Sequence, residues 1–115
     1  MANTFKTVTK AGVTSLDVIY TVASSTTTVV LGLMLGNTTT GQITATVTLN
    51  SDTAARSGAN DEANQAVELI TNAPIPAGSS LELLGGNKVV LETTDEIKVS
   101  ASGATDVALS IMEIT

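Results

Sequence analysis

The sequence of 115 residues contains no cysteine, no histidine and no tryptophan, and it has one phenylalanine and one tyrosine. Histidine is the side chain whose ordinary pKa lies nearest neutral pH, so its absence removes the commonest general acid or base. The absence of cysteine removes disulfides, a thiolate nucleophile and a ligand for soft metals. We therefore expect no enzymatic activity, no metal site and no cofactor.

Basic residues are also scarce, and the formal net charge is -6 at pH 7. Proteins that bind nucleic acid need clustered lysine and arginine, usually together with aromatic stacking platforms. The basic residues of this chain are scattered instead: Lys6, Lys10, Arg56, Lys88 and Lys98. We expect no nucleic-acid partner.

Long apolar runs are missing as well. The longest, residues 29–35, is much shorter than the roughly 20 residues that cross a bilayer as a helix. Residues 1–12 contain no apolar run of the kind that forms the core of a secretion signal. We expect no membrane partner, and synthesis and folding in the cytoplasm.

Threonine and serine are abundant and account for thirty residues, twenty of them threonine. Threonine is β-branched and suits a pleated surface that is half in contact with water. The apolar fraction of 43% is almost wholly aliphatic. The length fits one domain, which we place at residues 1–115.

Alternation of apolar and polar residues is the dominant pattern and predicts β-strands. Residues 43–49 alternate aliphatic side chains with Thr44, Thr46 and Thr48, which gives one dry face and one threonine face. Further strands are predicted at residues 5–9, 18–22, 27–37, 67–71, 81–83, 88–92, 97–99 and 107–114. Turn residues separate them at 10–12, 23–25, 37–41, 74–80, 85–87, 93–95 and 102–104. The fold class is an all-β antiparallel sandwich, jelly-roll or immunoglobulin-like, with about eight or nine short strands.

The segment 27–37 carries apolar residues on both of its faces. Val29, Leu31, Leu33 and Leu35 fall on one face in simple alternation, and Val30 and Met34 fall on the other. One interpretation is a central strand that its own domain covers on both sides. The other is that Val30 and Met34 form a subunit interface with a second copy of the chain.

A long polar segment, residues 51–65, separates two of the predicted strands. It is longer than most connections in compact domains, and loops of this length often make functional contacts or are disordered. We predict a loop with one helical turn at residues 61–66.

Several short patterns resemble chemical sites but are better explained as structure. The acidic pairs Asp61-Glu62 and Asp95-Glu96 are typical of solvated turns, and Asp52 with the first pair would be the only calcium ligands that the long loop offers. Gly85-Gly86-Asn87-Lys88 lacks the spacing of a phosphate-binding loop and leads into a strand, which favours a hairpin turn. Neither Ser79 nor Ser80 lies in a nucleophile elbow.

Carbohydrate binding has little support, because sugars usually stack on aromatic rings and only Phe5 and Tyr20 are available. Asn37-Thr38-Thr39 matches a glycosylation acceptor, but we interpret it as a turn.

Most of the chain outside residues 51–65 resembles small β-rich virion proteins of tailed bacteriophages. The similarity lies in APIPAGSSLELL (73–84), GNKVVLE (86–92) and DEIKVSA (95–101), with FKT (5–7), IYTV (19–22) and LSIMEI (109–114). The resemblance implies a particle component that has no active-site residues. Among such proteins, a capsid decoration (cement) protein that binds the major capsid protein is the first hypothesis, and a homotrimer is the expected assembly.

Two alternatives remain open at this stage. The first is a neck, tail or baseplate adaptor or fibre-attachment subunit, and the second is a receptor- or glycan-binding module. Both a decoration protein and an adaptor subunit would be located in the virion.

Overall fold

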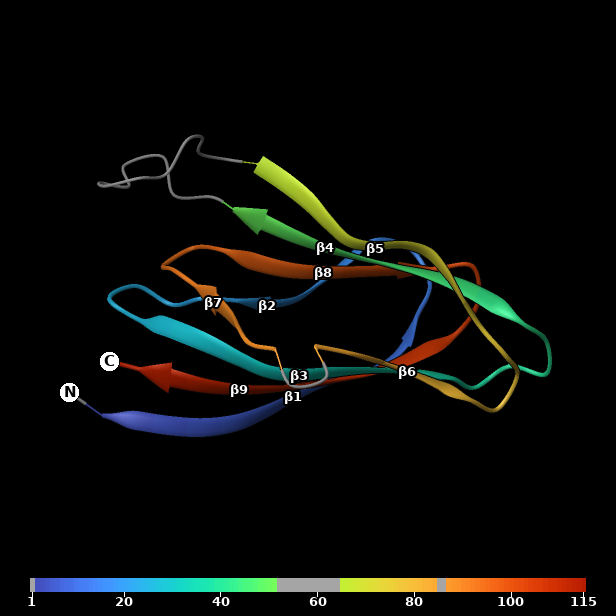
Figure 1. The fold of residues 1–115 in the computed structure, drawn as a ribbon, viewed down its shortest axis with the longest axis horizontal. Coiled ribbons are helices and arrows are strands. Elements are labelled where there is room, and N and C mark those ends of the chain that lie inside the picture. The colour runs from blue at the N-terminus through green and yellow to red at the C-terminus, as the bar shows by residue number, and fades with distance from the viewer. Residues whose placement is uncertain (1, 52–64, 85–86) are drawn as a thin grey trace.

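A computed structural model describes residues 2–51, 65–84 and 87–115, and within this part the chain forms nine strands and no helix (Figure 1). Their bounds are β1 Asn3–Val13, β2 Asp17–Thr21, β3 Thr27–Asn37, β4 Ile43–Ser51, β5 Gln65–Ile75, β6 Ser80–Leu83, β7 Val89–Leu91, β8 Glu96–Ala101 and β9 Thr105–Ile114. The predicted all-β antiparallel sandwich is confirmed, and each predicted strand has a counterpart.

The strand pairs are nested in the sequence. β1 pairs with β9, β2 with β8, β3 with β6 and β7, and β4 with β5, always antiparallel. This is one long antiparallel ribbon, which is rolled up so that β3 also pairs with β9 and β4 with β8. The result is two facing sheets in the orders β1-β9-β3-β6, with β7 also on β3, and β2-β8-β4-β5. That arrangement is a jelly roll, the first of the two sandwich types that the sequence predicted, and not an immunoglobulin-like sandwich.

The core lies between the two sheets and is aliphatic. Its fully buried members include Leu33, Leu35 and Leu109 from the first sheet and Val47 and Val99 from the second. The predicted alternation holds over most of both segments, because Ile43, Ala45 and Val47 of β4 and Val107, Leu109 and Ile111 of β9 are buried. It is imperfect at the end of β4, where Thr48 is buried as well and Leu49 is only partly buried. Burial of these side chains is the main free-energy gain of folding.

β3 differs from the predicted pattern because it contains a bulge. Its register against β9 shifts between Val30 and Gly32, so that Leu31 is an extra residue without an opposite partner. A bulge reverses the alternation. Before it, Thr28 and Val30 face the core, and after it Leu33 and Leu35 do. The prediction that Val29 shares a face with Leu33 and Leu35 is therefore wrong.

Two predicted strand ends are also wrong. Residues 10–12 do not end β1, which continues through a second bulge where Gly12 has a φ of 68°. Glycine adopts this left-handed conformation without steric cost. Pro74 lies inside β5, opposite Thr44, and the strand ends only before Pro76. β5 is at the edge of its sheet, where proline is tolerated.

Most of the long polar segment lies outside the described residues, and so do Asp52, Asp61 and Glu62. Within the predicted helical turn at 61–66, the described residues Gln65 and Ala66 belong to β5. The turns predicted at 23–25 and 93–95 are confirmed, with positive φ angles at Ser25 and Thr94.

Candidate assembly surface

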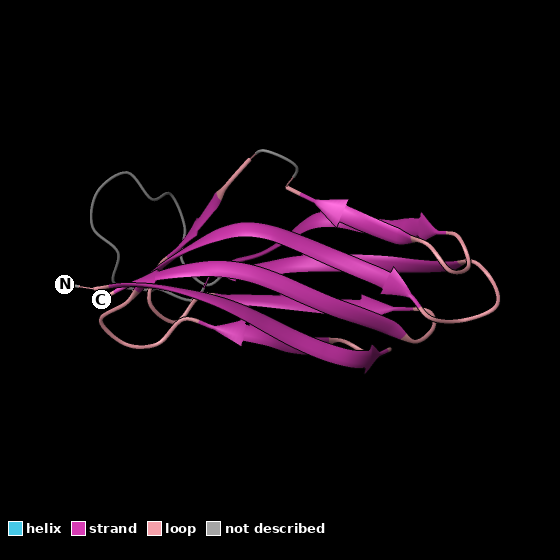
Figure 2. Ribbon diagram, turned by 90° about the horizontal axis from the view of Figure 1, so that it is seen from below, coloured by secondary structure: helices cyan, strands magenta, loops and turns pink. Residues whose placement is uncertain are grey.

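The outer face of the β1-β9-β3-β6 sheet, the side away from the core, carries a row of apolar side chains across the sheet. Phe5 lies opposite Met112, Met112 opposite Val29, and Val29 opposite Val90, so the row crosses β1, β9, β3 and β7. Phe5 is 71% exposed and Val90 60%. We call these four residues the apolar row. The sheet that carries it is the lower one in Figure 1 and therefore the nearer one in Figure 2, which is seen from below.

Three further rows lie parallel to the apolar row on the same face. The second row contains Thr7, Ser110 and Gly32; the third row contains Thr9, Ala108, Met34 and Glu82; and the fourth row contains Asp106, Gly36 and Ser80. These three rows mix small, polar and charged side chains with the single large apolar side chain of Met34.

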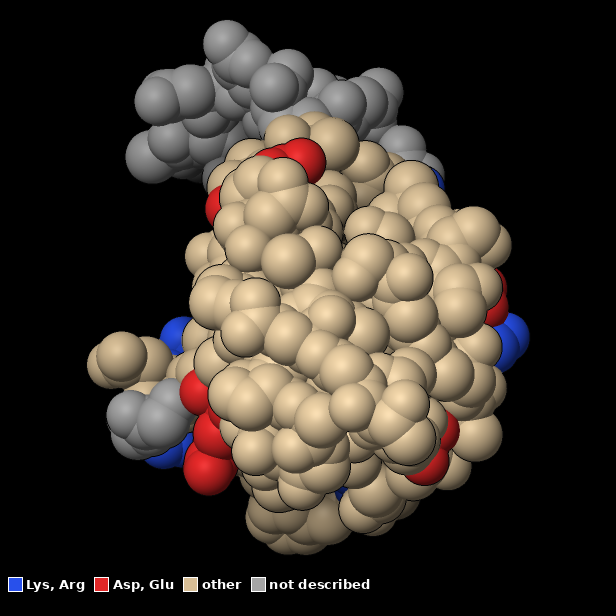
Figure 3. Space-filling view, turned by 90° about the vertical axis from the view of Figure 1, so that its right-hand side faces the viewer, with Lys and Arg blue, Asp and Glu red and all other residues tan. Residues whose placement is uncertain are grey.

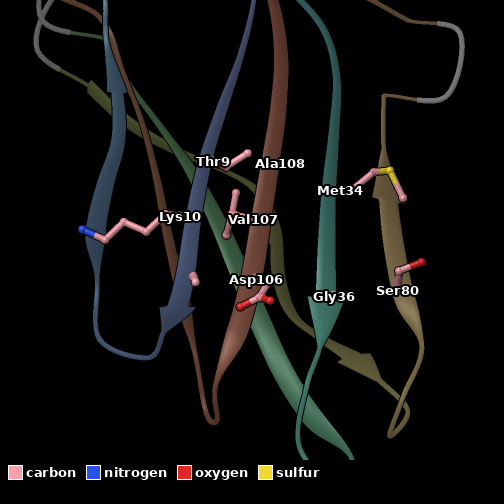
Figure 4. A pocket seen from close by; sticks show the side chains of 9 residues that line it. Thr9, Lys10, Met34, Gly36, Ser80, Asp106, Val107 and Ala108 are labelled. Atoms are coloured by element: carbon pink, nitrogen blue, oxygen red, sulfur yellow. The ribbon is translucent and has the colours of Figure 1, made fainter.

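Two hollows involve residues of this sheet. One, of about 240 Å³, lies over the second row between Phe5 and Leu31. The other, of about 390 Å³, is lined by Met34, Gly36, Ser80 and neighbouring residues of β1 and β9 (Figure 4). A Cβ added at Gly32 would meet nothing within 4 Å, which shows that the space above this glycine is open.

The outer face of the second sheet is chemically different. Thr44, Thr46 and Thr48 of β4 lie there, because the aliphatic residues between them face the core. Thr48 is opposite Lys98, and Thr46 is opposite Ser100. The first outer face thus has a continuous apolar row, whereas the second carries threonine and charged residues together with Val18, which is 41% exposed.

The two residues predicted to form a subunit interface lie on opposite sides of β3. Val30 is 1% exposed and packs in the core, so its side chain is not available to a partner. Met34 is 46% exposed on the outer face, beside Ala108 and Glu82. The bulge at Leu31 reverses the alternation between them, so Val30 faces the core and Met34 faces outward. A contact between Met34 and another subunit stays a prediction.

Sequence reasoning missed the apolar row, because its members come from four strands and are joined only by strand register. Phe5 and Met112 are 107 positions apart in the chain. One signal was present: in residues 107–114, Ala108 and Met112 are apolar residues on the side opposite the core positions.

A polar cluster joins the two sheets beside β1. The Tyr20 hydroxyl of β2 donates to Glu113 Oε2 of β9 at 2.6 Å, and Glu113 Oε1 lies 2.7 Å from Lys6 Nζ. The hydroxyls of Tyr20 and Thr28 are 2.8 Å apart. Because the Tyr20 proton is directed at the carboxylate, Thr28 is the donor in this second bond.

The cluster changes the acidity of two of its members. Burial, and then the hydrogen bond to Glu113, raise the pKa of Tyr20 to about 12. The Lys6 ammonium, and next the Tyr20 hydroxyl, hold the pKa of Glu113 below its ordinary value. Each of the four polar groups therefore has a partner within the cluster. Tyr20 is thus directed inward while Phe5 is on the outer face, and the two rings form no common sugar-binding platform.

One end of the sandwich shows few charged groups (Figure 3). Asn37 is 4% exposed near the tip of β3, and its Nδ2 donates to the carbonyls of Gly41 and Ile75. Its Oδ1 accepts from the backbone N–H of Thr39 at 2.8 Å. This buried amide closes the turn, which confirms the structural interpretation of Asn37-Thr38-Thr39.

The acidic pair Asp95-Glu96 was predicted to be solvated, and for Asp95 this is wrong. Asp95 is 2% exposed, and its Oδ2 accepts from the backbone N–H of Glu92 at 3.0 Å, which closes the turn before β8. Among the described residues, no three acidic side chains gather as potential metal ligands, and no helix is long and apolar enough to cross a membrane.

Distant structural likenesses include an appendage protein and a viral particle protein. No protein-family description and no curated protein matches the sequence. A structure from work titled "Bacillus endospore appendages form a novel family of disulfide-linked pili" aligns with a TM-score of 0.44 and 15% identity, covering 96% of this chain and 85% of that chain. A chain of the T13 viral particle of IBDV aligns with a TM-score of 0.26 and 13% identity, covering 96% of this chain and 35% of that chain.

Proposed function

We propose that this protein is a structural subunit of a virion, and specifically a capsid decoration protein of a tailed bacteriophage. In this role it binds the outer shell and stabilises contacts between major capsid protein subunits. The observation that carries the proposal is the apolar row on the outer face of the β1-β9-β3-β6 sheet, formed by Phe5, Met112, Val29 and Val90, in which Phe5 is 71% and Val90 60% exposed. Contiguous apolar surface of this kind marks a site of protein association.

The remaining surface suits the same role. Thr44 and Thr46 of β4 are partly exposed and carry neutral hydroxyl groups that can both donate and accept hydrogen bonds. The chain has only 14% charged residues, so little charge would have to be desolvated when it docks. The sequence resemblance to phage virion proteins supplies the type of particle.

Copy number in purified particles tests this proposal. A decoration protein repeats over the whole shell, so its abundance should be of the same order as that of the major capsid protein. Quantitative mass spectrometry of particles, scaled to the capsid protein, measures this ratio. A ratio corresponding to one ring, or to a few copies per particle, contradicts the decoration role and supports the neck, tail or baseplate adaptor.

A receptor- or glycan-binding module is the remaining alternative. It predicts binding of the isolated domain to a glycan array, and loss of that binding when residues 51–65 are replaced. The exposed ring of Phe5 is the feature of the described residues that favours this alternative.

A further inference from the structure

We infer that the free edge of β1 pairs with the same edge of a second copy of this chain, in an antiparallel two-fold dimer with Phe5 on the axis. The inference goes beyond the proposed function, because it assigns an edge of the sandwich to self-association. The outer face of the β1-β9-β3-β6 sheet stays open for docking to another protein.

β1 is a long and regular edge strand. It ends the first sheet, and within the described part of the chain no strand pairs with its other side. Its register against β9 is unbroken from Asn3 to Lys10, and residues 3–7 and 9–12 are exposed. The unpaired backbone groups of such an edge are a template on which another strand can pair.

The other edges of the described sheets are interrupted. β6 and β7 have four and three residues, and β2 has five with a register shift. β5 is long, but it has two register shifts against β4, a positive φ at Asn72 and a proline at Pro74. Short strands, bulges and proline keep sheet edges from pairing. β1 has none of these features over residues 3–10.

Lysine also protects sheet edges, and β1 contains Lys6 and Lys10. Each ammonium is neutralised by a carboxylate of its own chain. Lys6 Nζ lies 2.7 Å from Glu113 Oε1, and Lys10 Nζ lies 2.9 Å from Asp17 Oδ2. A strand that approaches this edge therefore meets ion pairs instead of free cations.

The hydrogen-bond pattern shows which backbone groups of β1 are directed at the free edge. Ala2 and Thr115 exchange two backbone hydrogen bonds, so they form a hydrogen-bonded pair. Such pairs alternate along an antiparallel ladder, which directs the N–H and C=O of even-numbered β1 residues at β9. The same groups of Asn3, Phe5 and Thr7 point away from β9 and are available to a partner strand.

The three available residues form a ladder with themselves when Phe5 lies on the two-fold axis. Phe5 is then opposite Phe5 of the second copy, and Asn3 is opposite Thr7 in both directions. Each of these pairs exchanges two hydrogen bonds. The two rings are cross-strand neighbours, and aromatic pairs of this kind are stabilising. Because the axis is perpendicular to the sheet, the apolar rows of the two copies join end to end on one side.

Other symmetric registers have less favourable side-chain pairs. An axis at Lys6 places that residue opposite itself, and an axis at Val8 places it opposite Lys10. Like charges that are directly opposite each other destabilise a strand pair. An axis at Thr7 leaves Phe5 opposite a threonine, without an aromatic partner. The register centred on Phe5 avoids both defects.

Sedimentation equilibrium of the purified chain and two proline variants tests the pairing. Thr7→Pro removes an N–H that points away from β9, so the fold should tolerate it, as edge strands do. It also removes a donor of the shared ladder in each copy, and we expect the dimer dissociation constant to rise about tenfold.

Thr9→Pro is the matched control for this variant. Thr9 has the same parity on the same edge, but it lies beyond residues 3–7, which form the shared ladder. We expect it to change the dissociation constant by about twofold at most. Circular dichroism should show the wild-type fold for both variants.

Cysteine cross-linking tests the register, because the chain has no cysteine of its own. In Phe5→Cys the two thiols meet on the axis at a spacing that suits a disulfide, and mild oxidation should give a cross-linked dimer. Thr7→Cys is the control. The two copies of position 7 lie four residues apart along the paired strands, which is about 14 Å and too far for a disulfide.

Four results overturn the inference: a wild-type chain that is monomeric at about 1 mM, a wild-type trimer, a dimer that Thr7→Pro leaves as tight as Thr9→Pro does, and cross-linking of Thr7→Cys as fast as that of Phe5→Cys. Should Thr7→Pro fail to fold, the cross-linking comparison alone decides.

The proposed function is tested separately, because the proline variants leave the side chains of the apolar row unchanged. A monomer that still binds particles in shell-like numbers would remove the dimer and keep the decoration role. A dimer that is absent from particles would do the reverse.

Discussion

Tyr20 shows how a single residue reports on the packing of this fold. Its ring comes from one sheet, while its two hydroxyl partners, Glu113 and Thr28, come from the other. A phenolate at this position would be buried beside a carboxylate, and this is why the pKa of Tyr20 is raised to about 12 from 10.0. Since it is the chain's one tyrosine, its titration can be followed without interference.

We expect phenolate absorbance to develop with a midpoint near pH 12, well above that of free tyrosine. Glu113→Gln removes the carboxylate charge and should move the midpoint downward. Because the pKa is raised in the folded state, the neutral ring contributes stability that is fully present below pH 10 and is lost as the pH rises toward 12. A wild-type midpoint near 10 would show that the hydroxyl is not held between the sheets.

For Glu113 the stability of the fold changes with pH in the opposite direction to that for Tyr20. Its pKa is lowered in the folded protein by Lys6 and Tyr20, so ionised Glu113 stabilises the fold above its ordinary pKa of 4.5. That contribution is lost as the pH falls through the lowered value. Denaturant unfolding at a series of acid pH values should therefore show a steeper loss for the wild type than for Glu113→Gln. Equal slopes would contradict a folded-state interaction at this carboxylate.

At the scale of the element, β3 decides which residues are core and which are surface. Its bulge at Leu31 places Val30 inside and Met34 outside, although the two have the same parity in the sequence. The same substitution should therefore change the stability of the fold much more at Val30 than at Met34.

Val30→Asp buries a charge without a partner, and we expect it to destabilise the fold by about 3 kcal/mol or more. Met34→Asp places the charge at the surface and should change the stability of the monomer by less than about 0.5 kcal/mol. Urea unfolding at a concentration where the chain is monomeric measures both. Similar losses at the two positions would contradict the bulge.

At the scale of the whole molecule, the rolled ribbon brings the two ends of the described chain together (Figure 1). Ala2 and Thr115 exchange two backbone hydrogen bonds, of 3.1 and 2.9 Å, which extend the β1-β9 ladder. The turn between β5 and β6 is exposed at residues 76–79 and is tightened by Gly78, with a φ of 68°.

A circular permutant should therefore fold. Joining Thr115 to Ala2 through a short flexible linker, with new ends between Ala77 and Gly78, preserves every strand and every strand pair. We expect the far-ultraviolet spectrum of the parent protein and cooperative thermal unfolding at a somewhat lower temperature. A permutant that stays unfolded would argue against the adjacency of the two ends.

Much of this fold is determined by sequence alone, because alternation is a local property. The aliphatic and threonine positions of residues 43–49 specify one strand with one dry face, whatever its partners are. Turn residues such as Ser25 and Asn37 likewise mark where strands end. Single-domain sandwich architecture follows from many such strands in a short chain.

Strand register, by contrast, is decided only in the tertiary structure, because it depends on which distant segments pair. The bulge in β3 is defined by its pairing with β9, and it allows both Val30 and Leu33 to face the core. The apolar row is a product of the same register, which aligns Phe5, Met112 and Val90 across the sheet. The sequence supplies the apolar side chains, and the pairing of distant strands makes them one surface.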